Sequence, residues 1–312
     1  MSKKIAFLFP GQGSQYVGMG KKILEAYPET KEIFEQTDEI CKMSISQLCF
    51  EGPMDELTLT ENLQPAITAV NLACLKVLNN AGIQPYVSAG HSLGEYSALV
   101  SAGVLKTVDA IKLVKIRGVL MHRESTKKPG TMAAIIGLDI EKVQEIVDKA
   151  KDHGVLSVAN HNSREQIVIT GEHEPLKKAI KIAKENKAKA IPLKVSGAWH
   201  SELMKDAVSD FRQFMEDIQF STPSSKIIFN ATAKEENDPE LIKDIMANQL
   251  VSPVRWYESI INMLDQGVDT FVEVGPKRVL VGLMKKIVPA GRSVKIFNVE
   301  DPEGVERLIN AI

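Results

Sequence analysis

The pentapeptide GHSLG at residues 90–94 constrains the fold of this chain more than any other short segment. The letters VSA before it suit the end of a strand, and Leu93, Tyr96 and Val100 recur at helical spacing after it. A strand, a sharp turn and a helix form the context in which G-x-S-x-G exposes a serine hydroxyl, because the glycines leave room for the turn. The pattern predicts Ser92 as a nucleophile; the alternative is a small residue in an ordinary turn.

Composition narrows the class of protein. The 312 residues are 44% hydrophobic and 25% charged, as in an ordinary globular protein of one large or two smaller domains. A net charge of −2 gives no global field for nucleic acid or a membrane surface. No apolar run approaches the ~18 residues of a membrane span, and Ile5–Phe9 is too short for a signal peptide. We therefore expect neither nucleic acid nor membrane as a partner.

Three cysteines bear on compartment and metal binding. Cys41, Cys49 and Cys74 have no metal-ligand spacing and leave an odd count. They are typical of reduced thiols in a cytoplasmic protein, so we expect a cytoplasmic location and no metal site.

Strands alternate with helices along most of the chain, which predicts a mostly parallel sheet with helices on both faces. Between Pro129-Gly130 and Ser196-Gly197 the pattern changes to βαββαβ, the ferredoxin-like order. Its expected strands are 131–137, 155–160, 166–170 and 190–195, and its expected helices are 141–151 and 175–187. The fold class is therefore α/β: a large α/β-hydrolase-like domain over 1–128 and 198–312, with a small ferredoxin-like domain inserted at 129–197.

A serine hydroxyl is a poor nucleophile and needs a base. His91 is a poor candidate, since neighbours across a sharp turn point apart. His200, in KVSGAWHSELM, follows an expected strand and a glycine and precedes a helical stretch. A structural role for His200 stays open beside the catalytic one. The nearest downstream acid is Asp206 and no orienting aspartate is evident, so a Ser–His dyad is the simpler hypothesis.

Arg117 lies among apolar neighbours on an expected helix, where a guanidinium is costly unless it meets an anion. One interpretation is a structural salt bridge to an internal Asp or Glu. The other is a fork that holds a substrate carboxylate.

The loop FPGQGSQ at 9–15 follows an expected strand and invites a nucleotide-binding interpretation. The dinucleotide fingerprint requires a third glycine where the chain has Tyr16, so we reject that cofactor. The loop can still bring a backbone N–H near a reacting centre, where it and the N–H after Ser92 would form an oxyanion hole. A simple tight turn is the alternative.

Several segments in a fixed order carry a resemblance that covers nearly the whole chain. They are FPGQGSQ (9–15), GHSLGEYSAL (90–99), RGVLM (117–121), ANHNS (159–163), SGAWHS (196–201), QLVSPVRW (249–256) and EVGP (273–276). The chain resembles the malonyl-CoA:acyl-carrier-protein transacylases and, more widely, the acyltransferase domains of fatty acid and polyketide synthases.

The resemblance implies a function and roles for individual residues. Ser92 would be acylated by malonyl-CoA, His200 would be its base, and Arg117 would hold the malonyl carboxylate. The backbone N–H groups of Gln12 and Leu93 would form the oxyanion hole. The acyl group would then pass to the phosphopantetheine thiol of acyl carrier protein for fatty acid synthesis, with no cofactor. A trans-acting polyketide acyltransferase, an acyl-thioester hydrolase using the same dyad and a docking module without turnover are the alternatives.

Further positions follow from the same resemblance. The backbone carbonyl of Gln249 would accept a hydrogen bond from His200, and Asn160 and Asn162 would face the cleft as possible substrate-binding residues. Trp199 and His161 depart from the family pattern, as do Arg164 and Lys277.

Overall fold

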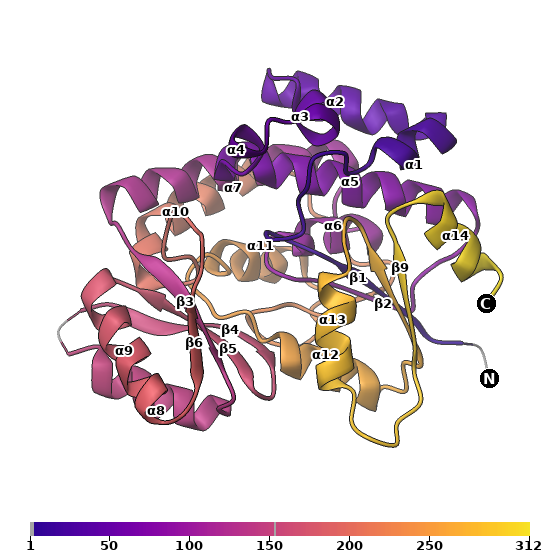
Figure 1. The fold of residues 1–312 in the computed structure, drawn as a ribbon. Helices are drawn as coiled ribbons and strands as arrows, with labels where there is room; N and C mark the ends of the chain where they lie inside the picture. The colour runs from indigo at the N-terminus through magenta and orange to yellow at the C-terminus, as the bar shows by residue number, and fades with distance from the viewer. Residues whose placement is uncertain (1–2, 153) are drawn as a thin grey trace.

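The computed structural model describes residues 3–152 and 154–312 and contains two sheets (Figure 1). The larger sheet has the order β7-β2-β1-β8-β9, and every pairing between neighbouring strands in it is parallel. Its strands are β1 (Ile5–Phe9), β2 (Val87–Gly90), β7 (Lys226–Ile227), β8 (Thr270–Val274) and β9 (Lys295–Val299). All five residues of β1 are buried, as a strand covered on both faces requires.

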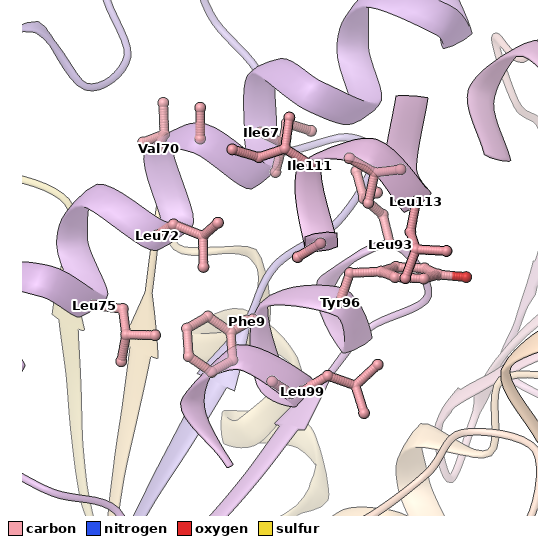
Figure 2. Packing of buried hydrophobic residues seen from close by; sticks show 14 of the residues in the cluster. Phe9, Ile67, Val70, Leu72, Leu75, Leu93, Tyr96, Leu99, Ile111 and Leu113 are labelled. Atoms are coloured by element: carbon pink, nitrogen blue, oxygen red, sulfur yellow. The ribbon is translucent and has the colours of Figure 1, made fainter. Parts of the chain in front are cut away.

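Side chains of β1 alternate between two hydrophobic clusters, one on each face of this sheet. Phe7 and Phe9 join the first, and Ala6 and Leu8 join the second. Helices α5 (Thr60–Asn80), α6 (Gly94–Ser101) and α7 (Thr107–Lys127) contribute to the first cluster, and Figure 2 shows Phe9 between leucines of α5 and α6. Helices α12 (Trp256–Asp265) and α13 (Val279–Ile287) supply the second.

The remaining elements complete the covering of the parallel sheet and connect it to the second one. They are the helices α1 (Lys21–Ala26), α2 (Lys31–Cys41), α3 (Ile45–Glu51), α4 (Met54–Leu57), α10 (Lys205–Phe214), α11 (Pro239–Asn248) and α14 (Pro302–Ile309), with 3-10 turns at Pro28–Thr30, Glu202–Met204 and Met215–Asp217. No helix in the described part of the chain combines the length and apolar character needed to cross a bilayer.

The second sheet is antiparallel, in the order β4-β5-β3-β6. Its elements follow the chain as β3 (Thr131–Ile136), α8 (Ile140–Ala150), β4 (Leu156–Ser163), β5 (Gln166–Gly171), α9 (His173–Glu185) and β6 (Lys189–Pro192). This is the expected βαββαβ order, and the α/β fold class with a small ferredoxin-like unit is confirmed. The boundaries at 129 and 197 stay a prediction.

One strand end differs from expectation for a physical reason. Strand β4 continues to Ser163, three residues beyond the expected end, because its outer edge meets another segment: Asn160 bridges to Val254.

Candidate active site

The turn between β2 and α6 has no room for side chains on its flanking glycines. A Cβ on Gly90 would collide with the backbone of Gly94, and a Cβ on Gly94 would collide with the carbonyl of Phe9. Ser92 itself adopts φ +50°, a left-handed conformation that non-glycine residues rarely occupy. The tight turn thus holds the serine hydroxyl out from the sheet, as the sequence pattern predicts.

The structure brings Ser92 and His200 together from positions 108 residues apart. Ser92 Oγ lies 2.8 Å from His200 Nε2. On the other side of the ring, His200 Nδ1 lies 2.9 Å from the carbonyl oxygen of Gln249 and 3.0 Å from that of Ser252. A carbonyl only accepts, so Nδ1 carries the proton and Nε2 presents its lone pair to the serine.

Burial keeps this imidazole neutral. His200 is 4% exposed. Desolvation, followed by the charge of Arg117, lowers the pKa of His200 to about 3. Asp206 is not a third member of the site, since its carboxylate pairs with Lys128 at 2.8 Å on the surface. Two main-chain carbonyls therefore orient the histidine without an acid.

Arg117 is buried against the serine and touches neutral partners. Its Nη2 lies 3.2 Å from Ser92 Oγ. Nη1 donates to Gln64 Oε1 at 2.9 Å, and Nε and Nη2 both donate to Gln249 Oε1, at 3.2 and 2.9 Å. Within residues 3–152 and 154–312, no carboxylate oxygen comes within 4.0 Å of the guanidinium. The salt-bridge interpretation of Arg117 is therefore wrong for the described residues, and the buried charge lacks an anion.

Two backbone N–H groups beside Ser92 have no acceptor within the described part of the chain. Neither Gln12 nor Leu93 donates a backbone hydrogen bond to another described residue. Both residues line the cleft. The loop is pressed against the elbow, since a Cβ on Gly11 would lie 3.4 Å from Leu93 N and collide with the carbonyl of His91. Two free donors next to a nucleophile can stabilise a developing oxyanion.

The cleft around these groups has a volume of about 110 Å³. Its lining residues are Gln12, His91, Ser92, Leu93, Arg117, Met121, Met132, Asn160, Leu193, Val195, Trp199 and His200. Asn160 thus borders the cleft, whereas the Asn162 side chain lies against His91, with Oδ1 2.7 Å from Nε2. No group of three His, Cys, Asp or Glu side chains in the described residues could hold a metal ion.

Comparison with known proteins places this cleft in a family. Residues 6–298 match the model of the acyl transferase domain. This chain belongs to the acyl transferase domain family. It is 44% identical over 311 residues to the malonyl CoA-acyl carrier protein transacylase of Bacillus subtilis (strain 168), which covers 99% of this chain and 97% of the relative.

Solved structures of acyl transferases have the same fold. An acyl carrier protein S-malonyltransferase from Vibrio cholerae superimposes with a TM-score of 0.94 at 39% identity, covering 98% of this chain and 100% of that one. A malonyl-transacylase structure solved with a type II PKS acyl-carrier protein gives a TM-score of 0.95 at 36% identity, covering 99% and 100%. The resemblance derived from the sequence segments is thereby confirmed.

The acyl transferase site also contains a buried polar network that the sequence patterns did not single out. Asn230 Oδ1 accepts from the Ser92 backbone N–H at 2.7 Å, and Asn230 Nδ2 donates to the Gly90 carbonyl at 2.7 Å. Glu95 accepts from the Asn230 backbone N–H and from the Gln249 side-chain amide. Burial raises the pKa of the Glu95 carboxyl to about 7, although the two hydrogen bonds act to lower that pKa. In the sequence, the polar residues Gln64 and Glu95 within otherwise apolar helices are the feature that could have indicated such a network.

Proposed function

We propose that this chain transfers a malonyl group from malonyl-CoA to the phosphopantetheine thiol of acyl carrier protein, and so supplies extender units for fatty acid synthesis. The names of its relatives support this assignment. The observation that carries it is the buried Arg117 guanidinium beside Ser92, whose hydrogen-bond partners among the described residues are two side-chain amides and a hydroxyl. A buried cation without an anion favours a substrate with a free carboxylate at that place.

The first half-reaction forms an ester on Ser92. His200 Nε2 takes the hydroxyl proton while Ser92 Oγ attacks the thioester carbonyl carbon, so a C–O bond forms and the carbonyl oxygen becomes an oxyanion. The N–H groups of Gln12 and Leu93 bind that oxyanion, each with on the order of 3 kcal/mol. When the C–S bond breaks, the imidazolium returns the proton to the departing CoA sulfur.

The second half-reaction reverses these steps with a new thiol. His200 removes the proton from the phosphopantetheine thiol, whose sulfur attacks the malonyl ester, and the proton ends on Ser92 Oγ. Arg117 holds the carboxylate throughout, and the Gln249 carbonyl keeps the proton of His200 on Nδ1. A cleft of about 110 Å³ leaves room for a short acyl group. We place this reaction in the cytoplasm, where the three cysteines remain thiols.

Intact-mass spectrometry after exposure to malonyl-CoA tests the proposal. We expect a gain of one malonyl group in the protein and none in Ser92→Ala, followed by loss of the adduct when acyl carrier protein is added. Steady release of malonate without carrier protein would identify a thioester hydrolase. Absence of any adduct on the native chain would leave a docking module.

A carrier protein of polyketide synthesis is the second candidate acceptor. It is favoured by the similarity to a transacylase bound to a type II PKS acyl-carrier protein. Comparing kcat/KM for carrier proteins of the two pathways distinguishes the candidates, since the natural acceptor is expected to have the higher value.

A further inference from the structure

The edge strand of the small sheet is joined to the large domain beside the cleft. β4 pairs with β5 on one side only. On its outer edge His161 N donates to the Val254 carbonyl at 2.9 Å, and Val254 N donates to the Ala159 carbonyl at 2.7 Å. The pairing of β4 with β5 is irregular at this place, and residues 159–163 are all buried. Both faces of this part of the strand are therefore covered.

The segment 254–258 reaches both the elbow and β4. Arg255 N donates to the backbone carbonyl of Asn230 at 3.1 Å, and Asn230 holds the Ser92 N–H. The Trp256 ring packs edge-on against His91, with centroids 5.5 Å apart. A shift of β4 along this segment would thus move the wall of the cleft relative to the nucleophile.

His161 makes the side-chain contact across this seam. Its side chain is 8% exposed, its ring lies 4.9 Å from that of Tyr257, and its Nδ1 is 3.2 Å from Glu258 Oε1. The angles are not those of a hydrogen bond: neither ring nitrogen of His161 makes one to a described residue, and Glu258 Oε2 also has no hydrogen-bond partner among the described residues. Arg255 lies near the same carboxylate, with Nε 3.6 Å from Glu258 Oε1.

The flanking residues connect this contact to the reaction. Asn160 borders the cleft, and Asn162 lies within hydrogen-bonding distance of His91 next to the nucleophile. Successive residues of a strand point to opposite faces, so His161 faces α12 while both asparagines face the site. Burial alone would raise the pKa of Glu258, but His161, a backbone N–H and Arg255 together hold that pKa below its usual value. The carboxylate is thus kept charged for the imidazole.

We propose that His161 is a positioning residue for malonyl binding: by pairing with Glu258 across the seam it fixes Asn160 and Asn162 against the elbow. It touches no reacting atom. The expected effect on KM rests on the proposed malonyl transfer. The role of the His161–Glu258 contact in holding the seam does not.

The kinetic test uses the full-length enzyme and a double-mutant cycle. His161→Phe keeps a ring against Tyr257 and removes the nitrogens, and Glu258→Gln keeps the shape and removes the charge. Each is expected to raise KM for malonyl-CoA about 5-fold with kcat unchanged, and the double variant is expected to be no worse than either single one, because neighbours in contact are not additive. His173→Phe, at an exposed site on α9, is the matched control.

Hydrogen exchange provides a readout that needs no substrate. The amides of residues 159–163 and 254–258 should exchange faster in both single variants, while those of β3 should not change. An unchanged KM, a fall in kcat alone, additive effects or unchanged exchange would each overturn the proposal. If the native chain took no malonyl group, the proposed function would fail while the exchange result still decided whether the His161–Glu258 contact holds the seam.

Discussion

At the scale of single residues, the site depends on Arg117, a buried cation that forms no salt bridge within residues 3–152 and 154–312. Among the described residues, the hydrogen-bond partners of Arg117 are two glutamine side chains and a serine hydroxyl, and the Glu95 carboxylate accepts from the side-chain amide of Gln249. Amides compensate a buried charge less well than a carboxylate does, so an anionic substrate gains more from this place than a neutral one.

Replacing Arg117 should change substrate preference. Arg117→Ala is expected to lower kcat/KM for malonyl-CoA about 100-fold, as when a charge-assisted pair is lost. Transfer from acetyl-CoA should be kept or improved, since it has no carboxylate to bind. Steady-state kinetics with both thioesters measure the change, with Lys127→Ala at an exposed position of the same helix as control. Unchanged malonyl kinetics would refute the role of Arg117.

At the scale of elements, close approach of helices positions that arginine. A Cβ on Gly118, the residue after Arg117, would lie 2.9 Å from Glu61 Cα and 3.0 Å from the Thr60 carbonyl oxygen. Helix α7 therefore rests directly on the backbone at the start of α5. The backbone atoms of α5 cannot turn aside as a side chain would, so contact of this kind fixes the height of α7 over the nucleophile.

Two glycines in helices should respond in opposite directions to the same substitution. Gly118→Ala is expected to destabilise the protein by about 1–3 kcal/mol through overpacking. Gly282→Ala in α13, where a Cβ meets nothing within 4 Å, should stabilise it by about 0.5–1 kcal/mol, as alanine does in an open helical position. Urea unfolding of both variants checks this, and equal effects would contradict the close contact between α5 and α7.

The junction between β8 and α13 should make stability depend on pH. Glu273 at the end of β8 accepts from the N–H groups of Leu280 and Val281, yet burial raises its pKa from 4.5 to about 7. Between these values the folded state binds more protons than the unfolded state, so this group's contribution is lost as pH rises through 7. The slope is at most about 1.4 kcal/mol per pH unit.

Comparison with Glu273→Gln isolates that contribution. The free energy of unfolding of the native chain, relative to the variant, should fall between pH 5.5 and pH 8. Denaturant titrations at the two pH values measure it. A relative stability that does not change over this interval would show that the pKa of the Glu273 carboxyl is not raised in the folded protein.

Sequence patterns anticipated most elements and missed the contacts that join them. The glycines around Ser92 predicted the elbow because their requirement is local. Gln64 is unusual as a polar residue in an apolar helix, but the contacts of Gln64 and Asn230 could not be predicted, since each reaches the site from more than 25 residues away through a single side chain. The end of β4 at Ser163 was missed for a similar reason: its outer edge is completed by Val254, and no local periodicity reports such a partner.

At the scale of the whole molecule, the cleft lies where the parallel and the antiparallel sheets meet, and the largest hydrophobic cluster includes residues of both. Ser92 follows the parallel sheet, Asn160 belongs to the antiparallel one, and His200 comes from the chain that returns after it. An anionic acyl group bound at Arg117 would therefore contact residues of both parts and stabilise both.

Acylation should stabilise the entire protein. The malonyl enzyme is expected to unfold at a higher temperature than the free enzyme, by roughly 2 to 4 °C for each kcal/mol gained. The acetyl enzyme should gain less, because it adds no anion. Differential scanning calorimetry of the three forms measures this, and Arg117→Ala should abolish the difference between the acyl groups. Equal midpoints for malonyl and acetyl forms of the native chain would argue against an anion at Arg117.

In the free enzyme, the side-chain oxygens of Gln64 and Gln249 accept the guanidinium hydrogen bonds that a substrate carboxylate would accept. A substrate carboxylate at Arg117 would replace some of these amide contacts, which would form again when the acyl group leaves. An acyl group without a carboxylate has no charged oxygen to accept these hydrogen bonds. The choice between acyl groups thus depends on an exchange of hydrogen bonds at Arg117, which precedes the attack of Ser92 on the thioester carbon.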